Sequence, residues 1–319
     1  MTQGFASDPS SCDKLDDNNW DDWDDDWENT DNKNEGDNNG DNNEGDNKDN
    51  EENVTVGWLE LPETKTNDNL KWYFHTFEEL SGCSLKGRNF SFDWCPEERL
   101  AHWVAFPLYE GCCGSGRSES WGYDPKVPRE EQANLSKSYG ENTEHGYFYT
   151  RGHQMASSDR NADKIMNKTT FYYTNMTPQI ADFNGGSWSK VETKVQSYMS
   201  GADTLYVVTG VYMTEGAVWT PDKFGNQCIV PDYYYRAVLY YKKGDTQTTV
   251  NGSGYRAIGF WMDHRKSYSA ADKNVACSIR KLEELTGVNF FVNLPAAVGE
   301  ETAAAIEAQD PTTVPAWQL

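Results

Sequence analysis

The sequence contains no run of about 18 apolar residues, the length that a transmembrane helix requires. It also lacks any pair of cysteines at the Cys-x-x-Cys spacing that is typical of zinc ribbons and thiol oxidoreductases. Basic residues are scarce, because 28 Lys and Arg stand against 51 Asp and Glu, and the formal net charge is −23. These absences exclude a transmembrane helix and a CxxC redox centre, and the charge argues against a broadly basic nucleic-acid-binding surface.

The first 53 residues account for most of this acidity and for the low hydrophobic content of 37%. They hold 19 Asp and Glu against 3 Lys, which leaves a net charge of only −7 for residues 54–319. A segment with few apolar groups and dense like charge cannot offset the entropy lost on ordering. We therefore predict a disordered acidic tail or stalk over residues 1–53 and one folded domain over residues 54–319.

Three tryptophans, Trp20, Trp23 and Trp27, recur at helical spacing among the aspartates of the tail. This spacing predicts a helical element that binds a partner, although short charged segments of this kind are more often unstructured. Three roles therefore stay open for the tail: a stalk, an interaction element, and a DNA mimic that occupies the active-site cleft.

Cys12 is separated from the other six cysteines by the acidic tail. The segment Ser10-Ser11-Cys12, followed by Asp13, resembles the start of a mature surface lipoprotein of Gram-negative bacteria, in which the cysteine is acylated. The resemblance implies a lipid anchor at Cys12 and an extracytoplasmic location, either secreted or on the outer surface. The apolar leader that should precede such a cysteine is not found, because residues 1–10 are polar.

Six cysteines remain in the predicted domain, enough for three disulfides in an oxidising compartment. Cys83 and Cys95 form the most plausible local pair, and free buried thiols are the alternative. A zinc site ranks below both, because adjacent cysteines are awkward tetrahedral ligands. The six are Cys83, Cys95, Cys112, Cys113, Cys228 and Cys277, of which Cys112, Cys113 and Cys228 would hold the zinc.

Apolar periodicity predicts a domain of strands joined by loops, with few helices, which places it in the α+β class. Alternating or buried apolar runs predict strands at 90–94, 101–106, 145–149, 171–174, 205–210 and 233–241. Helical spacing predicts an amphipathic helix at about 186–199. A second helix is predicted at 279–286, where Gly287 provides the C-cap.

Phosphodiester hydrolysis needs a base for water, positive charge for the phosphorane, and help for the leaving oxygen. His153 can serve as the base, and Arg151 can contact phosphate oxygens in bidentate geometry. Asn175 and Asn184 offer amide oxygens suited to Mg²⁺, and Glu192 can hold one of its waters. Each residue also has an ordinary structural interpretation, because a lone histidine is more often hydrogen-bonded than catalytic.

The order of these residues resembles the DNA/RNA non-specific endonuclease family of the ββα-metal, or His-Me finger, superfamily. The resemblance covers about residues 71–294. It rests on Tyr149-Thr150-Arg151-Gly152-His153-Gln154-Met155-Ala156, Thr174-Asn175-Met176-Thr177-Pro178-Gln179, Asp182-Phe183-Asn184-Gly185-Gly186-Ser187-Trp188 and Glu192.

The resemblance implies a central antiparallel sheet flanked by helices, with a ββα-metal catalytic motif. It implies a metal-dependent, sugar-non-specific endonuclease that hydrolyses DNA and RNA. His153 would be the general base, and Asn184 would be the direct ligand of a hydrated Mg²⁺, with Mn²⁺ as the alternative. Glu192 would orient a metal-bound water. Asn175 would support this arrangement, and Arg151 and Arg117 would contact the phosphate.

Two positions depart from the family pattern. Thr150 stands where the family's motif commonly begins with Asp, and Gln196 stands where some members carry a transition-state arginine. The loss of one such cation can cost on the order of 10²–10³ in rate unless Lys194 or Arg160 replaces it. The alternative function is therefore a catalytically weakened nucleic-acid-binding protein or a surface interaction lipoprotein on the same fold.

Overall fold

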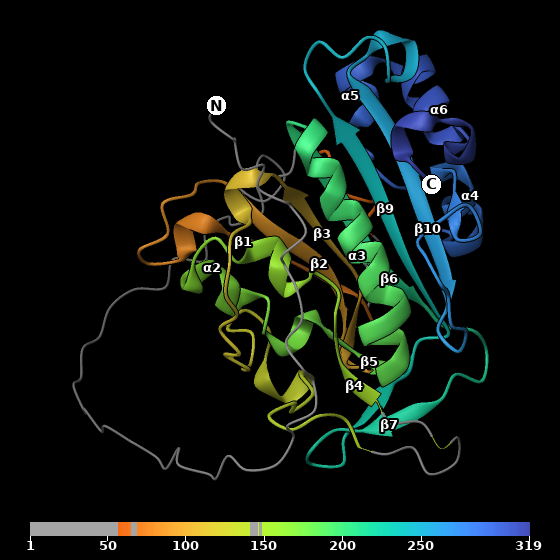
Figure 1. Ribbon diagram of the computed structural model, residues 1–319. Helices are drawn as coiled ribbons and strands as arrows, with labels where there is room; N and C mark the ends of the chain where they lie inside the picture. The colour runs from red at the N-terminus through yellow and green to blue at the C-terminus, as the bar shows by residue number, and fades with distance from the viewer. Residues whose placement is uncertain (1–56, 65–68, 141–145, 147–148) are drawn as a thin grey trace, which may run out of the picture. The chain divides into compact units, whose positions relative to one another are not determined.

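The computed structural model describes residues 57–64, 69–140, 146 and 149–319. The acidic tail, Cys12 and the three tail tryptophans lie outside these residues, so the tail, its boundary at residue 53 and the lipid anchor stay predictions. The described residues contain a seven-stranded sheet with the order β1-β2-β3-β6-β9-β10-β11, in which all neighbours are antiparallel (Figure 1). Its strands are β1 (Lys71–Thr76), β2 (Arg88–Cys95), β3 (Leu100–Leu108), β6 (Thr204–Tyr212), β9 (Tyr233–Tyr241), β10 (Tyr255–Asp263) and β11 (Ala276–Cys277).

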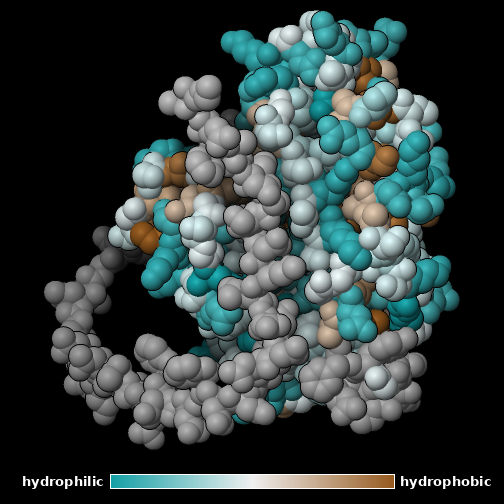
Figure 2. Space-filling view, viewed as in Figure 1, coloured by the Kyte–Doolittle hydropathy of each residue, from teal (hydrophilic) through white to brown (hydrophobic). Residues whose placement is uncertain are grey.

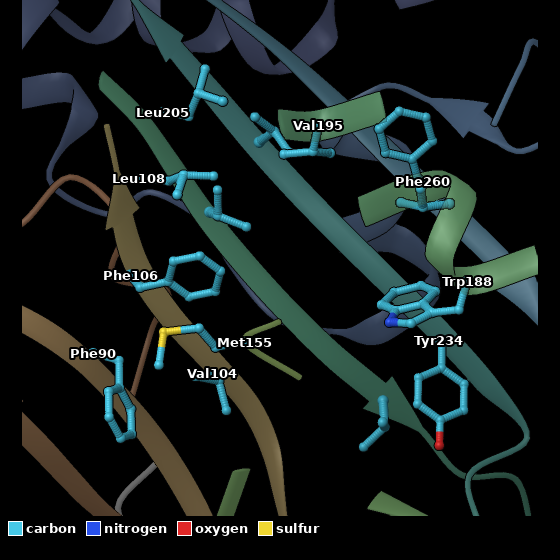
Figure 3. Close-up of a cluster of buried hydrophobic side chains, with 14 of the residues drawn as sticks. Phe90, Val104, Phe106, Leu108, Met155, Trp188, Val195, Leu205, Tyr234 and Phe260 are labelled. Atoms are coloured by element: carbon cyan, nitrogen blue, oxygen red, sulfur yellow. The ribbon is translucent and has the colours of Figure 1, made fainter. Parts of the chain in front are cut away.

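Both faces of this sheet are buried, which explains why its strands are nearly continuous apolar runs. In β9, Tyr234 and Val238 face one buried cluster, whereas Tyr235 and Leu239 face the other. The first cluster is closed by α3 (Ser189–Ser197), and Figure 3 shows Trp188 and Val195 packed with side chains from the strands. The second cluster is closed by α4 (Ile279–Thr286), α5 (Leu294–Val298) and α6 (Glu300–Ala308).

A separate hairpin leads into α3 and forms the predicted ββα unit. It pairs β4 (Tyr149–His153) with β5 (Met176–Ile180), and a π-helical turn, η6 (Phe183–Trp188), continues into α3. The long connection between β4 and β5 carries η4 (Ser157–Arg160), α2 (Lys164–Thr169) and η5 (Tyr173–Asn175). The remaining short elements are η1 (Phe77–Glu79), η2 (Glu110–Cys112), η3 (Arg129–Glu131), η7 (Tyr198–Gly201), β7 (Trp219–Pro221), β8 (Gln227–Ile229), η8 (Val250–Gly252), η9 (Pro311–Thr313) and η10 (Pro315–Trp317).

Most of the predicted elements are present, and the fold class is confirmed. The helix at 279–286 begins at the N-cap Ser278 and ends at Gly287, whose φ of 69° is the left-handed conformation that favours glycine. The strand predicted at 171–174 is wrong, because Tyr173–Asn175 is a 3₁₀ turn and the strand starts at Met176. The strand predicted at 145–149 begins only at Tyr149 in the described residues, so Arg151-Gly152-His153 lies within a strand instead of following one.

The cysteines of the described residues form no disulfide, so the predictions of three bridges and of a Cys83–Cys95 pair are wrong. The alternative holds for Cys95, Cys112 and Cys228, which are buried thiols outside any disulfide. Cys112 belongs to the core beneath α3, whereas Cys228 lies in a separate buried cluster around β7 and β8. This separation also contradicts the zinc site suggested for Cys112, Cys113 and Cys228.

The surface of the described residues is largely polar. Figure 2 shows hydrophobic residues scattered in small groups among hydrophilic ones on the face that it presents. None of the helices in this part of the chain is long and apolar enough to span a membrane.

His264 joins the hairpin to the sheet. Its Nδ1 donates to the carbonyl of Pro231 at 2.8 Å, and its Nε2 accepts the backbone N–H of Ile180, the last residue of β5, at 2.8 Å. Only the neutral imidazole can make both bonds, because a protonated ring has no acceptor. Burial also lowers the pKa of His264 to about 4.

The pH dependence of unfolding tests this role. Between about pH 6.5 and pH 4 the unfolded chain binds a proton at His264 that the folded chain does not, so stability falls as the pH falls. A shift of this size corresponds to about 3 kcal/mol, and His264→Phe should remove that part of the slope. Denaturant unfolding of both proteins across this window is the measurement, and an unchanged slope in the variant would contradict the assignment.

Candidate active site

His153 is the last residue of β4 and lies opposite Met176 of β5. Its ring is 9% exposed and packs against Trp121 at 5.6 Å and edge-on against Phe171 at 5.2 Å, measured between ring centroids. Its Nε2 atom is buried and has no hydrogen-bond partner among the described residues. A buried polar atom without a partner is costly, so this nitrogen is a candidate for contact with water or substrate.

The surroundings of His153 keep its imidazole neutral. Burial, reinforced by the nearby charges of Arg117 and Arg151, lowers the pKa of His153 well below its ordinary value. A neutral imidazole retains one unprotonated ring nitrogen and can accept a proton at physiological pH. The side chain therefore has the protonation state that a general base needs.

Two guanidinium groups flank this ring, each resting on an aromatic face. The guanidinium carbon of Arg151 lies 3.6 Å from the centroid of Trp121, and one Nη donates to the carbonyl of Leu135 at 3.1 Å. The guanidinium carbon of Arg117 lies 5.0 Å from the centroid of Phe171. Because each guanidinium carries five N–H donors, most of them remain available for phosphate oxygens.

Thr150, the first departure from the family pattern, holds the predicted metal ligand. Asn184, in the π-helical turn η6, donates from Nδ2 to Thr150 Oγ1 at 3.0 Å. Thr150 in turn donates its hydroxyl hydrogen to the carbonyl of Gln179 at 3.1 Å. With its amide nitrogen engaged in this way, Asn184 has its amide oxygen left for a cation.

Glu192 lies in the first turn of α3, where its carboxyl group is half-buried. Burial raises the pKa of Glu192 to about 7, although the positive charges of Arg236 and Arg117 oppose this effect. A cation beside the carboxyl group would favour its ionised form. The amide oxygen of Asn184 and the carboxylate of Glu192 are hard donors of the kind that suits Mg²⁺ with several retained waters, so these residues fit a hydrated divalent cation.

Arg236 is the residue that sequence reasoning missed. It is fully buried in the middle of β9, where its Nε donates to Thr209 Oγ1 at 2.8 Å and one Nη donates to the carbonyl of Gln154 at 3.1 Å. The same Nη lies 3.8 Å from a carboxylate oxygen of Asp159. The available signal was a lone charged residue in the otherwise apolar run Tyr233–Tyr241.

Gln196, the second departure from the family pattern, hydrogen-bonds to the carboxylate beside Arg236. Its Nε2 donates to Asp159 Oδ1 at 2.8 Å and to Ser158 Oγ at 2.6 Å. Gln196 and Arg236 thus contact the same carboxylate, and the charge of Arg236 also acts on Glu192. The cation beside Gln196 and Asp159 in this chain is Arg236 of β9.

Arg160 and Lys194, the predicted substitutes for that cation, are engaged elsewhere. Arg160 is fully buried, and its guanidinium donates to the side chain and carbonyl of Asn89 and to the carbonyls of Pro107 and Asp159. Lys194 donates to the carbonyl of Gln318. The structure thus gives Arg160 buried protein partners, and its predicted contact with substrate as a replacement cation stays a prediction.

Asn175 acts on the backbone that follows His153. It is fully buried, and its Oδ1 accepts the N–H of Met155 at 2.9 Å. Its Nδ2 donates to the carbonyls of Met155 and Thr170 at 2.9 and 2.8 Å. The side chain is therefore a clamp that fixes the connection between β4 and β5, and it supports His153 without facing a cation.

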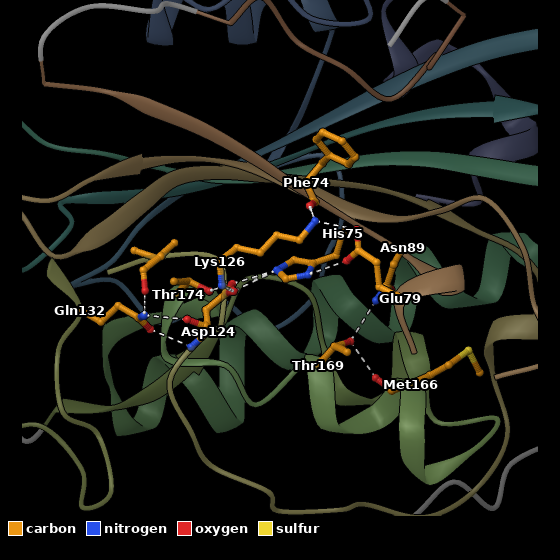
Figure 4. Close-up of polar contacts among 11 residues, drawn as sticks. Phe74, His75, Glu79, Asn89, Asp124, Lys126, Gln132, Met166, Thr169 and Thr174 are labelled. Atoms are coloured by element: carbon orange, nitrogen blue, oxygen red, sulfur yellow. Dashed lines mark hydrogen bonds and ion pairs between the residues drawn. The ribbon is translucent and has the colours of Figure 1, made fainter. Parts of the chain in front are cut away.

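A buried ion pair holds the segment that carries Trp121. His75 contacts both carboxylate oxygens of Asp124 at 3.0 and 3.1 Å, and Asp124 also accepts the hydroxyl of Thr174 at 2.7 Å (Figure 4). Although burial opposes the charge, hydrogen bonds to Asp124 and Glu79 raise the pKa of His75. The pair thereby ties β1 to the residue that precedes Asn175.

Residues 76–297 match the family model described as DNA/RNA non-specific endonuclease. The chain belongs to this family. It is accordingly an endonuclease, a hydrolase whose substrates are nucleic acids, and the family is metal-dependent.

Several curated nucleases are similar to this family member. A nuclease of Serratia marcescens is 24% identical over 203 residues, which cover 62% of this chain and 70% of that protein. The mitochondrial Nuclease 1 of Schizosaccharomyces pombe is 25% identical over 57% of this chain, and mitochondrial Nuclease EXOG of Xenopus laevis is 24% identical over 54%. The matches span 56% and 47% of those two proteins.

A solved structure supports the fold. A crystal structure of the EndoG/EndoGI complex contains a chain that superposes with a TM-score of 0.52 at 16% identity. The superposition covers 75% of this chain and 90% of the other. At this identity the likeness concerns the fold alone.

Substitution of Asn175 by aspartate tests the clamp. The variant keeps an acceptor for Met155 but places a carboxylate oxygen against two carbonyls, and an unmatched buried group of this kind costs at least about 2 kcal/mol. We expect a lower unfolding free energy together with reduced cleavage. Asn251→Asp, at an exposed asparagine, is the matched control. If Asn175→Asp is as stable and active as that control, the clamp is not needed.

Proposed function

We propose that the protein is a metal-dependent, sugar-non-specific endonuclease that hydrolyses phosphodiester bonds of DNA and RNA. In this proposal His153 is the general base, and Asn184 is the protein ligand of a hydrated Mg²⁺, which Mn²⁺ can replace. The observation that carries it is the buried, unpartnered Nε2 of a neutral His153 between Arg117 and Arg151. Asn184 and Glu192 supply the oxygen donors.

The residues divide the chemistry among them. His153 accepts the proton of the attacking water at its unprotonated ring nitrogen, which burial keeps free of a proton at physiological pH. Arg151 and Arg117 offer fixed positive charge to the non-bridging phosphate oxygens. When bound, the divalent cation supplies further charge for the phosphate and the leaving oxygen. Asn175 and Arg236 act through the backbone around His153, and they count as positioning residues.

The choice of substrate follows from what these groups recognise. The imidazole acts on the attacking water, and the guanidinium groups and the cation act on phosphate, which DNA and RNA share. The net charge of −7 on residues 54–319 does not oppose this, because Arg117, Arg151 and the cation concentrate positive charge at one place.

Cleavage of plasmid DNA and of RNA with Mg²⁺ tests the proposal. His153→Ala should reduce kcat on both substrates by about 10²–10⁴, the usual contribution of a general base. Asn184→Ala should raise the Mg²⁺ concentration needed for half-maximal cleavage, and Asn289→Ala, at an exposed asparagine, should match the wild type. A wild-type protein that binds nucleic acid but cleaves neither substrate with Mg²⁺ or Mn²⁺ would favour the catalytically weakened alternative instead.

We also propose a secreted or outer-surface location with a lipid anchor at Cys12. The support is the sequence Ser10-Ser11-Cys12-Asp13 alone, because the free thiols of the described residues do not require an oxidising compartment. Membrane fractionation of Gram-negative cells that produce the wild type and Cys12→Ala tests it. Equal release of both proteins into the soluble fraction would contradict the anchor.

A further inference from the structure

Three different metal-binding side chains meet at the turn between β2 and β3. Cys95 ends β2, Glu98 lies in the turn, and His102 belongs to β3. One potential ligand atom of each lies within 4.8 Å of the other two. Among the described residues, no other three histidine, cysteine or acidic side chains come together in this way.

The backbone holds this turn rigidly from two sides. Arg99 adopts a φ of 55°, which is uncommon for a residue other than glycine and persists where the surroundings enforce it. Its N–H donates to the carbonyl of Cys95 at 2.9 Å, and its guanidinium donates to the carbonyls of Glu130 and Gln132 at 2.8 and 3.0 Å. The carbonyl of Glu98 accepts the N–H of Ile229 at 3.1 Å. The backbone positions from which the side chains of Cys95, Glu98 and His102 extend are therefore fixed.

The donor set and its spacing suit zinc. Zinc binds thiolate sulfur, imidazole nitrogen and carboxylate oxygen, and it accepts three protein ligands with water in the fourth place. In a tetrahedral site of this kind the ligand atoms lie roughly 3.3–3.6 Å apart, so the present cluster needs only small side-chain rotations. The side chains of His102 and Glu98 are 31% and 24% exposed, which leaves access for the ion and a water.

A catalytic cysteine is the other chemistry that this trio suggests, and the surroundings oppose it. Cys95 is only 5% exposed, whereas a cysteine nucleophile must be accessible to its substrate. His102 Nε2 contacts Glu98 Oε2 at 2.5 Å, so the partner of the imidazole is the carboxylate and not the thiol.

We propose that Cys95, Glu98 and His102 bind one Zn²⁺ ion, at residues distinct from those of the catalytic cation. The ion cross-links the end of β2, the turn and β3. It also stiffens β3 beside the catalytic hairpin, because the carbonyl of Ala101 accepts Nε2 of Gln154, the residue after His153, at 2.7 Å.

Zinc titration of the EDTA-treated full-length protein against a chromophoric chelator tests the site. The wild type and Asn184→Ala should both bind one tight equivalent of Zn²⁺, because the catalytic ligand takes no part in it. Cys95→Ser and His102→Gln should weaken this equivalent at least tenfold. Cys277→Ser, at a half-buried cysteine outside the cluster, is the control and should bind as the wild type does.

Co²⁺ substitution identifies the ligands independently of affinity. We expect a sulfur-to-cobalt charge-transfer band in the wild type, in Asn184→Ala and in Cys277→Ser, and its loss in Cys95→Ser. Zn²⁺ should also raise the Tm of the wild type more than that of Cys95→Ser, because a ligand that binds the folded state stabilises it. If Cys95→Ser fails to fold, Glu98→Gln and His102→Gln, both at partly exposed side chains, provide the comparison.

Two results would overturn the proposal. One is a wild type whose only zinc equivalent disappears in Asn184→Ala, and the other is a cobalt spectrum without a thiolate band. Magnesium-dependent cleavage by Cys95→Ser is a separate readout, so failure of the zinc site and failure of the nuclease proposal are distinguishable.

Discussion

The burial of one guanidinium group in the middle of the sheet is the constraint on which the site depends. Arg236 has no access to solvent, and an unpaired buried charge is strongly destabilising. Its Nε and one Nη donate to Thr209 on the neighbouring strand and to the Gln154 carbonyl, the Asp159 carboxylate lies nearby, and the other Nη has no hydrogen-bond partner among the described residues. Two of these groups lie in the connection that follows β4. The charge in the sheet therefore fixes the backbone that follows His153.

Around Arg236, the site combines the buried imidazole of His153 with polar side chains that hydrogen-bond to their neighbours. His153 lies among aromatic rings and arginines, which keep it neutral. Asn175 clamps the chain on one side of it, and Thr150 orients Asn184 on the other. The two departures from the family pattern fit this arrangement. A threonine hydroxyl suffices to hold the amide of Asn184, and Gln196 shares Asp159 with Arg236.

Sequence patterns correctly predicted the elements whose conformation depends on residues close together in the sequence. The apolar run of β9 and the helix that ends at Gly287 were predictable, because burial of a continuous strand and a left-handed C-cap leave traces within a few residues. The strand predicted at 171–174 failed for the opposite reason. Asn175 receives its conformation from Met155 and Thr170, and the side-chain contact with Met155 crosses 20 residues of sequence.

The same distinction applies to the candidate site. The candidate base, the candidate metal ligand and both arginines were predicted from the resemblance to the family. The partners of Thr150, Arg160 and Arg236 did not, because each depends on which strands become neighbours. The disulfide prediction failed similarly, since cysteine count carries no information on distance, and Cys95 meets Glu98 and His102 instead.

The folded protein keeps the His153 ring neutral, with one unprotonated nitrogen that can accept a proton. Histidine-selective ¹⁵N NMR across the acidic range, with His153→Gln to assign the signals, tests this most directly. Because its surroundings disfavour the protonated form, the His153 ring should remain neutral at about pH 6, where an ordinary histidine is largely protonated. A His153 signal that titrates at about pH 6.5 would contradict the account.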